Sequence, residues 1–240
     1  MSAGSLWLIP STLGGETAAD VIPEGVLSRV RSLRCFLAED PKSARAFLKL
    51  AGHPGPMQEL RIERLTNSTS PDELAAMINV IRGGLDAGII SEAGCPAIAD
   101  PGAPLVRLAH AAGLRVIPLT GPSSITLALM ASGLDTQRFA FHGYLPIKEP
   151  ERSRAIRKFE ERSRGESETQ IFIETPYRNQ ALLAAILKAC RADTLLCLAR
   201  DLTLPTEEVL TLPVRAWSGR NTGLDGRPCV FLFLAQREIT

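Results

Sequence analysis

Two short loops rich in glycine, proline and serine most constrain the fold of this 240-residue chain. The first covers residues 91–102 (SEAGCPAIADPG) and follows the apolar run 86–90, and the second covers 119–124 (LTGPSS) and follows the apolar run 114–118. Each loop leaves a strand-like segment and enters a helix-like one. In open α/β sheets, ligands bind in the crevice outside the carboxyl ends of the strands. The two loops therefore predict a small-molecule site against exposed backbone.

Composition indicates an ordinary soluble protein, with 45% apolar and 22% charged residues. No apolar run has the length of a membrane helix, so we expect a cytoplasmic protein without membrane contacts. A formal net charge of +1 argues against nucleic-acid binding by bulk electrostatics and leaves local patches open. The five cysteines form no C-x-x-C pair and the three histidines are scattered, so no disulfide framework and no metal site are expected.

Strand and helix signals alternate along the first half of the chain. The clearest helix start is Ser70-Pro-Asp-Glu73, in which serine caps the helix, proline takes the first position and glutamate the third. Apolar residues then follow at helical spacing: Leu74, Met77, Ile78 and Ile81. This alternation predicts an N-terminal α/β domain, residues 1–119, built on a mostly parallel sheet.

The second half has a different character. A charged, helical segment at 151–164 precedes a break at Gly165, and a strand at 170–173 precedes an amphipathic helix at 177–189. Three β-rich stretches close the chain: 195–199, 208–214 and 229–234. We therefore predict a second α/β domain, residues 120–240, with a mixed sheet. The overall fold class is α/β with two α/β domains.

The loops contain residues suited to a ligand with polar edges. Gly94 and Gly102 permit close approach to the backbone. Ser123 and Ser124 lie near a helix N-terminus, which favours a carboxylate or phosphate. Any one of these residues, or Asp100, could serve only to shape a turn or cap a helix. The presence of two such loops together favours a binding site. Neither a G-x-G-x-x-G nor a P-loop motif is present, which disfavours dinucleotide and nucleoside-triphosphate chemistry.

Carboxylates at strand ends supply candidate acids and bases, and each is a helix cap or a catalytic group. They are Glu39 and Asp40, Glu92 in the first loop, Glu174, and Asp201 after Arg200. Arginines in the 151–164 segment are suited to phosphate contacts, but the interspersed glutamates favour a solvated helix face.

At these motifs the sequence resembles the tetrapyrrole methylase superfamily, the class III S-adenosylmethionine-dependent methyltransferases. Within it, the chain is most similar to the branch that methylates the ribose 2′-hydroxyl of a cytidine in small-subunit ribosomal RNA. The family patterns and their matches are S-D-A-G-x-P-x-x-x-D-P-G at 91–102 (with Glu92 for the aspartate), P-G-P-S-A at 120–124, F-x-G-F-L-P at 141–146, E-x-P-x-R at 174–178 and A-x-E-D-T-R at 37–42.

The resemblance implies two α/β domains with S-adenosylmethionine folded in the cleft between them, usually in a homodimer. It implies ribosomal RNA or the small ribosomal subunit as the partner. The residues it places at the donor are Ser91, Gly94, Pro96, Asp100, Pro122, Ser123 and Ser124, with Ala199 and Pro228 on the C-terminal side.

A ribose hydroxyl that accepts the methyl group must lose its proton to a base. Candidates for this base are Glu39, Asp40 and Glu174, while Arg178 and Arg200 are candidates to orient substrate phosphate.

Two departures leave other functions open. The family's R-E-L-T-K-x-x-E-E reads RDLTLPTEE at 200–208, so Leu204 stands at the lysine position, and the opening T-P-I-G-N-L-G-D is altered at 9–16. The alternatives to RNA methylation are methylation of a tetrapyrrole or another small molecule, and a non-catalytic module that only binds the donor.

Overall fold

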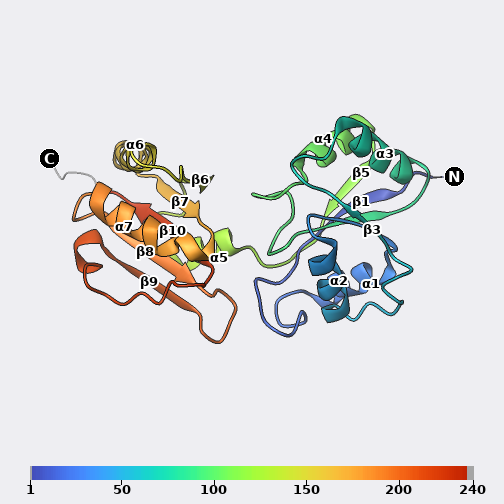
Figure 1. The fold of residues 1–240 in the computed structure, drawn as a ribbon, viewed down its shortest axis with the longest axis horizontal. Coiled ribbons are helices and arrows are strands. Elements are labelled where there is room, and N and C mark those ends of the chain that lie inside the picture. The colour runs from blue at the N-terminus through green and yellow to red at the C-terminus, as the bar shows by residue number, and fades with distance from the viewer. Residues whose placement is uncertain (1, 237–240) are drawn as a thin grey trace. The chain divides into compact units, whose positions relative to one another are not determined.

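The computed structural model describes residues 2–236, which divide into two compact units. The first unit ends at Ser123 and the second begins at Ser124. Each contains one sheet with its own helices (Figure 1). Within the described residues, no helix is both long enough and apolar enough to cross a membrane.

The first unit is a parallel sheet with helices on both faces. Its strands lie in the order β3-β2-β4-β1-β5, and neighbouring strands are parallel. The elements in chain order are β1 (Ser5–Ile9), α1 (Glu24–Ser32), β2 (Cys35–Ala38), α2 (Pro41–Leu50), β3 (Arg61–Arg64), α3 (Pro71–Arg82), β4 (Ala87–Ile90), α4 (Ala103–Ala111) and β5 (Arg115–Pro118). The parallel sheet predicted for the N-terminal half is confirmed.

The order of the strands decides which face each helix covers. From β1 to β3 the chain moves toward one edge of the sheet, and from β3 to β5 it moves back toward the other. Right-handed crossovers then place α1 and α2 on one face and α3 and α4 on the opposite face (Figure 1). The first unit has two hydrophobic cores, one on each face of the sheet, and they confirm this placement. Leu27 of α1 and Phe47 of α2 pack in one core, and Met77 of α3 and Leu105 of α4 pack in the other.

This strand order leaves a crevice at the edge of the sheet formed by the carboxyl ends of the strands. Strand β4 lies between β2 and β1, yet its helix α4 packs on the face opposite to α1 and α2. Connections that diverge in this way leave a crevice outside the carboxyl ends of the strands. Because the strands are parallel, the loops after β1, β2, β4 and β5 all begin at that edge.

The helix start predicted at Ser70 is confirmed. The Ser70 hydroxyl accepts the N–H of Glu73, and the Glu73 carboxylate accepts the N–H of Ser70 at 2.8 Å, so both halves of the capping box form. The buried residues of α3 are those predicted from the spacing: Leu74, Met77, Ile78 and Ile81.

The second unit is built on a mixed sheet in the order β6-β7-β10-β8-β9. Strands β6 and β7 are parallel, and the other neighbouring pairs are antiparallel. Its elements are α5 (Ser124–Ser132), β6 (Phe139–Tyr144), α6 (Glu151–Glu166), β7 (Thr169–Ile173), the 3-10 helix η1 (Pro176–Arg178), α7 (Asn179–Ala189), β8 (Leu195–Arg200), β9 (Glu208–Pro213), η2 (Val214–Ala216) and β10 (Cys229–Leu234). One core unites this sheet with α6 and α7, and the mixed sheet predicted for this half is confirmed.

The register of this sheet gathers three chain segments at one edge. Strand β10 begins beside the end of β7, where Val230 pairs with Ile173, and beside the end of β8, where Cys229 pairs with Arg200. Strand β6 also ends there, parallel to β7. We call this the arginine edge, and it comprises residues 174–179, 200–208 and 227–228.

Candidate functional site

At the carboxyl edge of the first sheet, hydrogen bonds tie the loop after β1 to the first glycine loop, residues 91–102. Ser11 follows β1, and its N–H donates to the carbonyl of Gly94 at 3.0 Å. The Ser11 hydroxyl donates to the carbonyl of Ser91 at 2.6 Å, and only 3% of the residue is exposed. These contacts hold two neighbouring strand-end loops as one body.

Within the first glycine loop, Asp100 is tied back to the start of the loop. The Ser91 hydroxyl donates to the Asp100 carboxylate. Burial raises the pKa of Asp100 above its ordinary value, an effect that the Ser91 hydrogen bond opposes and the charge of Glu92 reinforces. Helix α4 begins at Ala103 with Gly102 at its N-cap position. Asp100 therefore closes the loop instead of capping the helix.

The backbone of this loop is held in an uncommon conformation. Ala97 and Ala99 have φ angles of 64° and 59°, in the left-handed region, which costs an L-residue roughly 1–2 kcal/mol. Gly94 has a φ of 71°, and a Cβ there would lie 3.3 Å from the carbonyl oxygen of Pro122. Strained backbone concentrates at active sites and ligand clamps. The loop therefore has the geometry of a binding loop.

The second glycine loop, residues 119–124, packs directly on the loop after β1. A Cβ on Gly121 would lie 2.3 Å from Cγ of Pro10, so only glycine fits. The Cys95 thiol donates to the carbonyl of Pro122 at 3.5 Å and so links the two glycine loops. Burial raises the pKa of the Cys95 thiol, which keeps it protonated and disfavours a role as a nucleophile.

A hollow of about 570 Å³ lies beside these loops in the first unit. Pockets for small molecules usually measure ~300–1,000 Å³ and are mostly apolar with a few polar groups. The wall of the hollow comes from two strands, the first glycine loop and α4, and includes Leu8, Pro118, Pro96, Ile98, Val106 and His110. Its size and composition suit a small organic ligand.

A narrow cleft at the same edge is lined by carboxylates. The residues around it are the predicted Glu39, Ser91, Pro96 and Asp100 together with Glu92. Burial raises the pKa of Glu92, and the charges of Glu39 and Asp40 raise it further. A carboxylate that is buried beside other negative charges, as Glu92 is, accepts a proton more readily than an isolated one. The cleft is therefore a place where a proton can be received.

Asp40, predicted as a catalytic residue, lies at the N-cap of α2. Its carboxylate accepts the N–H groups of Lys42 at 3.2 Å and Ser43 at 3.0 Å, and the Ser43 hydroxyl at 2.8 Å. The hydrogen bonds from Ser43, and then that from Lys42, lower the pKa of Asp40. A lowered pKa makes a carboxylate a weaker base, so these hydrogen bonds disfavour Asp40 as a proton acceptor.

Glu174, a second predicted catalytic residue, lies at the arginine edge. It follows β7 and is buried, and its Oε1 accepts from Nε of Arg178 at 3.0 Å and from Nη2 at 2.7 Å. The same oxygen accepts the N–H of Thr175 at 2.7 Å. Glu174 is thus placed to orient the guanidinium of Arg178, which was predicted to contact substrate.

A buried carboxylate, Asp201, organises the other half of the arginine edge. It accepts from Nη1 of Arg227 at 2.9 Å and from the Thr206 hydroxyl at 2.9 Å, and Nη1 of Arg200 lies 3.6 Å away. Arg200 also pairs with Glu208. Sequence reasoning noted Asp201 only as a carboxylate at a strand end, because its partner Arg227 lies 26 residues away.

The structure thus separates the predicted residues into two groups. Near the first glycine loop are Glu39, Asp40, Ser91, Gly94, Pro96, Asp100, Pro122 and Ser123, while Ser124 opens α5. On or beside the arginine edge are Glu174, Arg178, Ala199, Arg200 and Pro228; Ala199 pairs with Val230, and the carbonyl of Pro228 accepts the N–H of Asp201 at 3.0 Å. Ser11 was missed, although a small polar residue two positions after the end of a strand was a usable signal. No cluster of His, Cys, Asp or Glu in the described part of the chain is suited to hold a metal ion.

The two α/β units match the model of a known protein family. The model of the family described as Tetrapyrrole (Corrin/Porphyrin) Methylases matches residues 17–216. The chain belongs to this family and is an S-adenosylmethionine-dependent methyltransferase.

Curated relatives and solved structures agree with this membership. A Pseudomonas aeruginosa protein named Ribosomal RNA small subunit methyltransferase I is 32% identical over 97% of this chain and 79% of its own length. A protein of the same name from Escherichia coli O157:H7 is 31% identical over 89% of this chain and 70% of its own. The methyltransferase CobJ superposes with a TM-score of 0.64 at 17% identity, covering 97% of this chain and 95% of CobJ. The cobalt precorrin-4 methyltransferase CbiF gives a TM-score of 0.61 at 16% identity, covering 96% and 94%. At these identities the two structures establish the fold alone.

Proposed function

We propose that this chain transfers the methyl group of S-adenosylmethionine to small-subunit ribosomal RNA, at the ribose 2′-hydroxyl of a cytidine. The observation that carries the proposal is the identity of 32% and 31%, over 97% and 89% of the chain, with two relatives named Ribosomal RNA small subunit methyltransferase I. Agreement over so much of the chain favours a shared acceptor in addition to a shared fold.

The first unit fits a sulfonium nucleoside. Main-chain N–H and C=O groups of the glycine loops suit the polar edges of an adenine and an amino acid, and the lack of a Cβ at Gly94 keeps open the space beside Pro122. The residues proposed to hold the donor are Ser91, Gly94, Pro96, Asp100, Pro122, Ser123 and Ser124. Ala199 and Pro228 remain predictions from the family resemblance.

Methyl transfer requires the protein to align atoms more than to stabilise charge. The bound donor supplies an electrophilic methyl carbon and a neutral thioether leaving group. With the donor bound, the C–S bond would break as the new C–O bond forms, and a base of this chain would take the proton of the ribose hydroxyl. Alignment of the nucleophile with the methyl carbon and exclusion of water supply much of the acceleration.

Among the three candidate bases, Glu39 has the strongest support. It lines the carboxylate cleft beside Ser91, whereas Asp40 caps α2 and Glu174 is paired with Arg178. Arg178 and Arg200 are proposed to orient substrate phosphate, since planar guanidinium groups bind phosphate through paired N–H groups. From the family resemblance we further propose that the chain acts as a homodimer in the cytoplasm, where it meets the small ribosomal subunit.

Transfer of a tritiated methyl group tests the proposal. Small subunits are taken from an Escherichia coli strain that lacks its Ribosomal RNA small subunit methyltransferase I, and label is expected in their RNA. Label that enters a tetrapyrrole or another small metabolite, and no RNA, would instead assign a small-molecule acceptor. Donor binding without transfer to either class would identify a non-catalytic donor-binding module.

A further inference from the structure

Buried polar atoms without a hydrogen-bond partner are concentrated at the arginine edge, where Arg200 Nη1 has only an ion-pair contact with Asp201. Among the described residues, four buried side-chain nitrogen or oxygen atoms have no hydrogen-bond partner, and three of them lie here: Asn179 Oδ1, Arg200 Nη1 and Thr203 Oγ1. Asn179 is 0% exposed, and its Nδ2 donates to the carbonyl of Arg227 at 2.7 Å. Buried polar groups are normally paired, so the arginine edge retains hydrogen-bonding capacity that its own side chains do not meet.

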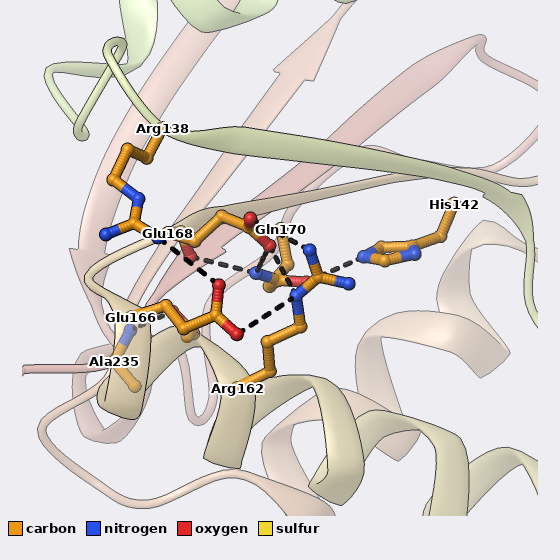
Figure 2. Close-up of polar contacts among 8 residues, drawn as sticks. Arg138, His142, Arg162, Glu166, Glu168, Gln170 and Ala235 are labelled. Carbon is orange, nitrogen blue, oxygen red and sulfur yellow. Dashed lines mark hydrogen bonds and ion pairs between the residues drawn. The ribbon is translucent and has the colours of Figure 1, made fainter.

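At the opposite end of the same sheet, the polar side chains are hydrogen-bonded or ion-paired with one another. Figure 2 shows Arg162 paired with Glu168 at 2.8 Å, Gln170 donating to Glu168 at 2.9 Å, and His142 in contact with Gln170 at 2.6 Å. None of the four unpartnered atoms of the described residues belongs to this network. Unmet hydrogen-bonding capacity is therefore a feature of the arginine edge and is not general to the unit.

The loop that follows β8 at this edge also has strained backbone. Asp201 and Thr203 have φ angles of 52° and 71°, although neither is glycine and Thr203 is β-branched. The loop is held in this shape by Asp201, which binds Arg227, and by Glu207, which accepts the N–H of Thr203 at 2.7 Å. Strain that the surrounding structure maintains is typical of functional segments.

An exposed aromatic ring completes the edge. Tyr177 is 78% exposed and lies on η1, the short helix that Pro176 begins directly after β7. The Arg178 guanidinium lies 5.5 Å from the centroid of the Tyr177 ring and is anchored on the buried Glu174 carboxylate. The ring and a cation are thus presented together on a short, anchored element.

We propose that the arginine edge binds an unpaired nucleotide of the RNA substrate, with its base stacked on Tyr177 and its phosphate contacted by Arg178 and Arg227. The inference rests on the proposed RNA methylation and names how that substrate is recognised. Unpaired RNA bases stack on aromatic rings and on guanidinium planes, and adjacent cations hold the phosphates. A ring as exposed as Tyr177 favours a macromolecular strand over a small, enclosed ligand.

The test compares two exposed aromatic residues at opposite ends of one sheet. Tyr177→Ala is expected to weaken binding of small-subunit RNA by about 5- to 100-fold, the range found when a stacking aromatic is removed, whereas Tyr177→Phe keeps the ring and the affinity. Phe139→Ala is the matched control, because Phe139 is 49% exposed and begins β6 at the other end of the sheet. Calorimetry with S-adenosylmethionine is expected to give the same donor affinity for all four proteins.

Tyr177→Ala protein that binds RNA like wild type overturns the inference, and so does a parallel loss of donor affinity, which would assign the edge to the donor. The thermal midpoint of each variant confirms that it folds, and little change is expected because both rings are exposed. Wild-type protein that binds and methylates no RNA would overturn the proposed function and the inference together. Wild-type methylation of RNA with an unaffected Tyr177→Ala variant overturns the inference alone.

Discussion

Single residues at the glycine loops make contacts that join one segment to another. Ser91 and Asp100 join the two ends of the first glycine loop, and Ser11 joins that loop to the neighbouring strand end. Each contact removes backbone freedom from a segment that would otherwise be mobile. The binding surface is thus preformed, which reduces the ordering cost when a ligand binds.

Replacing Asp100 by alanine is expected to weaken binding of S-adenosylmethionine about tenfold or more. A hydrogen bond to a charged group contributes roughly 1.5–3 kcal/mol, and its loss releases the loop. Titration calorimetry measures the affinity. Asp86→Ala is the control, because Asp86 accepts the N–H of Ser5 at 2.7 Å at the amino end of the same sheet, where its loss affects stability but not the donor. Equal donor affinities for the two variants would contradict the assigned site.

The two glycine loops could be recognised in the sequence, whereas their contacts with other segments could not. Glycine, proline and serine in 91–102 indicate a loop with unusual backbone, and the structure bears this out at Gly94. The role of Ser11 depends on the adjacency of β1 and β4, strands that are far apart in the chain. The Asp201–Arg227 contact likewise depends on antiparallel pairing in the second sheet. Local sequence patterns do not predict contacts between residues that are far apart in the chain.

At the scale of helices and strands, burial determined what could be predicted. Central strands such as β4 and β10 are apolar and were recognised, but β3 and β6 were missed. Both are edge strands without a fully buried residue, and β3 has the polar sequence Arg-Ile-Glu-Arg, whereas the edge strands β5 and β9 were recognised from their apolar residues. Helix α6 was predicted to break at Gly165 but continues to Glu166 and ends at Ser167, which has a φ of 52°. Packing of α6 against the sheet outweighs the low helix propensity of one glycine.

The cap of α2 gives a pH dependence with a defined sign. Hydrogen bonds lower the pKa of Asp40 in the folded state, so its stabilisation is present above the ordinary aspartate pKa and is lost as the pH falls through the lowered value. Asp40→Ala is therefore expected to lower the thermal midpoint at neutral pH, with a smaller difference from wild type in acid. Asp40→Asn keeps a capping oxygen and removes this titration. Thermal unfolding from neutral pH down to pH 3 measures the effect, and a difference that grows in acid would contradict the cap.

Contact between the second glycine loop and the loop after β1 gives a steric prediction. Gly121→Ala is expected to weaken donor binding, because its Cβ would lie 2.3 Å from Pro10 and force the loops apart. Gly25→Ala is the matched control, since no atom lies within 4 Å of a Cβ placed there on α1. Donor affinity of the control should equal that of wild type. Unimpaired binding by Gly121→Ala would show that the loops need not pack this closely.

At the scale of the whole molecule, the chain is two units with separate cores. Phe36 is buried in the first unit, and Phe172 is buried in the second. We therefore expect that substitutions can perturb the glycine loops and the arginine edge one at a time. It also explains why fold likeness to CobJ and CbiF survives at 17% and 16% identity, since each layered unit needs only its own apolar pattern.

Removing one core ring should therefore act on one unit. Phe172→Ala is expected to cost about 3–5 kcal/mol, as is usual for a fully buried phenylalanine. Hydrogen exchange should rise in β7, β8 and β10 and stay near wild-type values in β1, β2 and β4. Equal loss of protection in both sheets would contradict the independence of the two cores.

Titration of the wild-type protein with S-adenosylmethionine tests the central claim most directly, because every functional statement requires that nucleoside on the glycine loops. Saturable heat is expected, together with a higher thermal midpoint, since a ligand at 100 times its Kd stabilises the folded state by about 2.7 kcal/mol. No heat and no thermal shift at millimolar concentrations of the nucleoside would contradict the account.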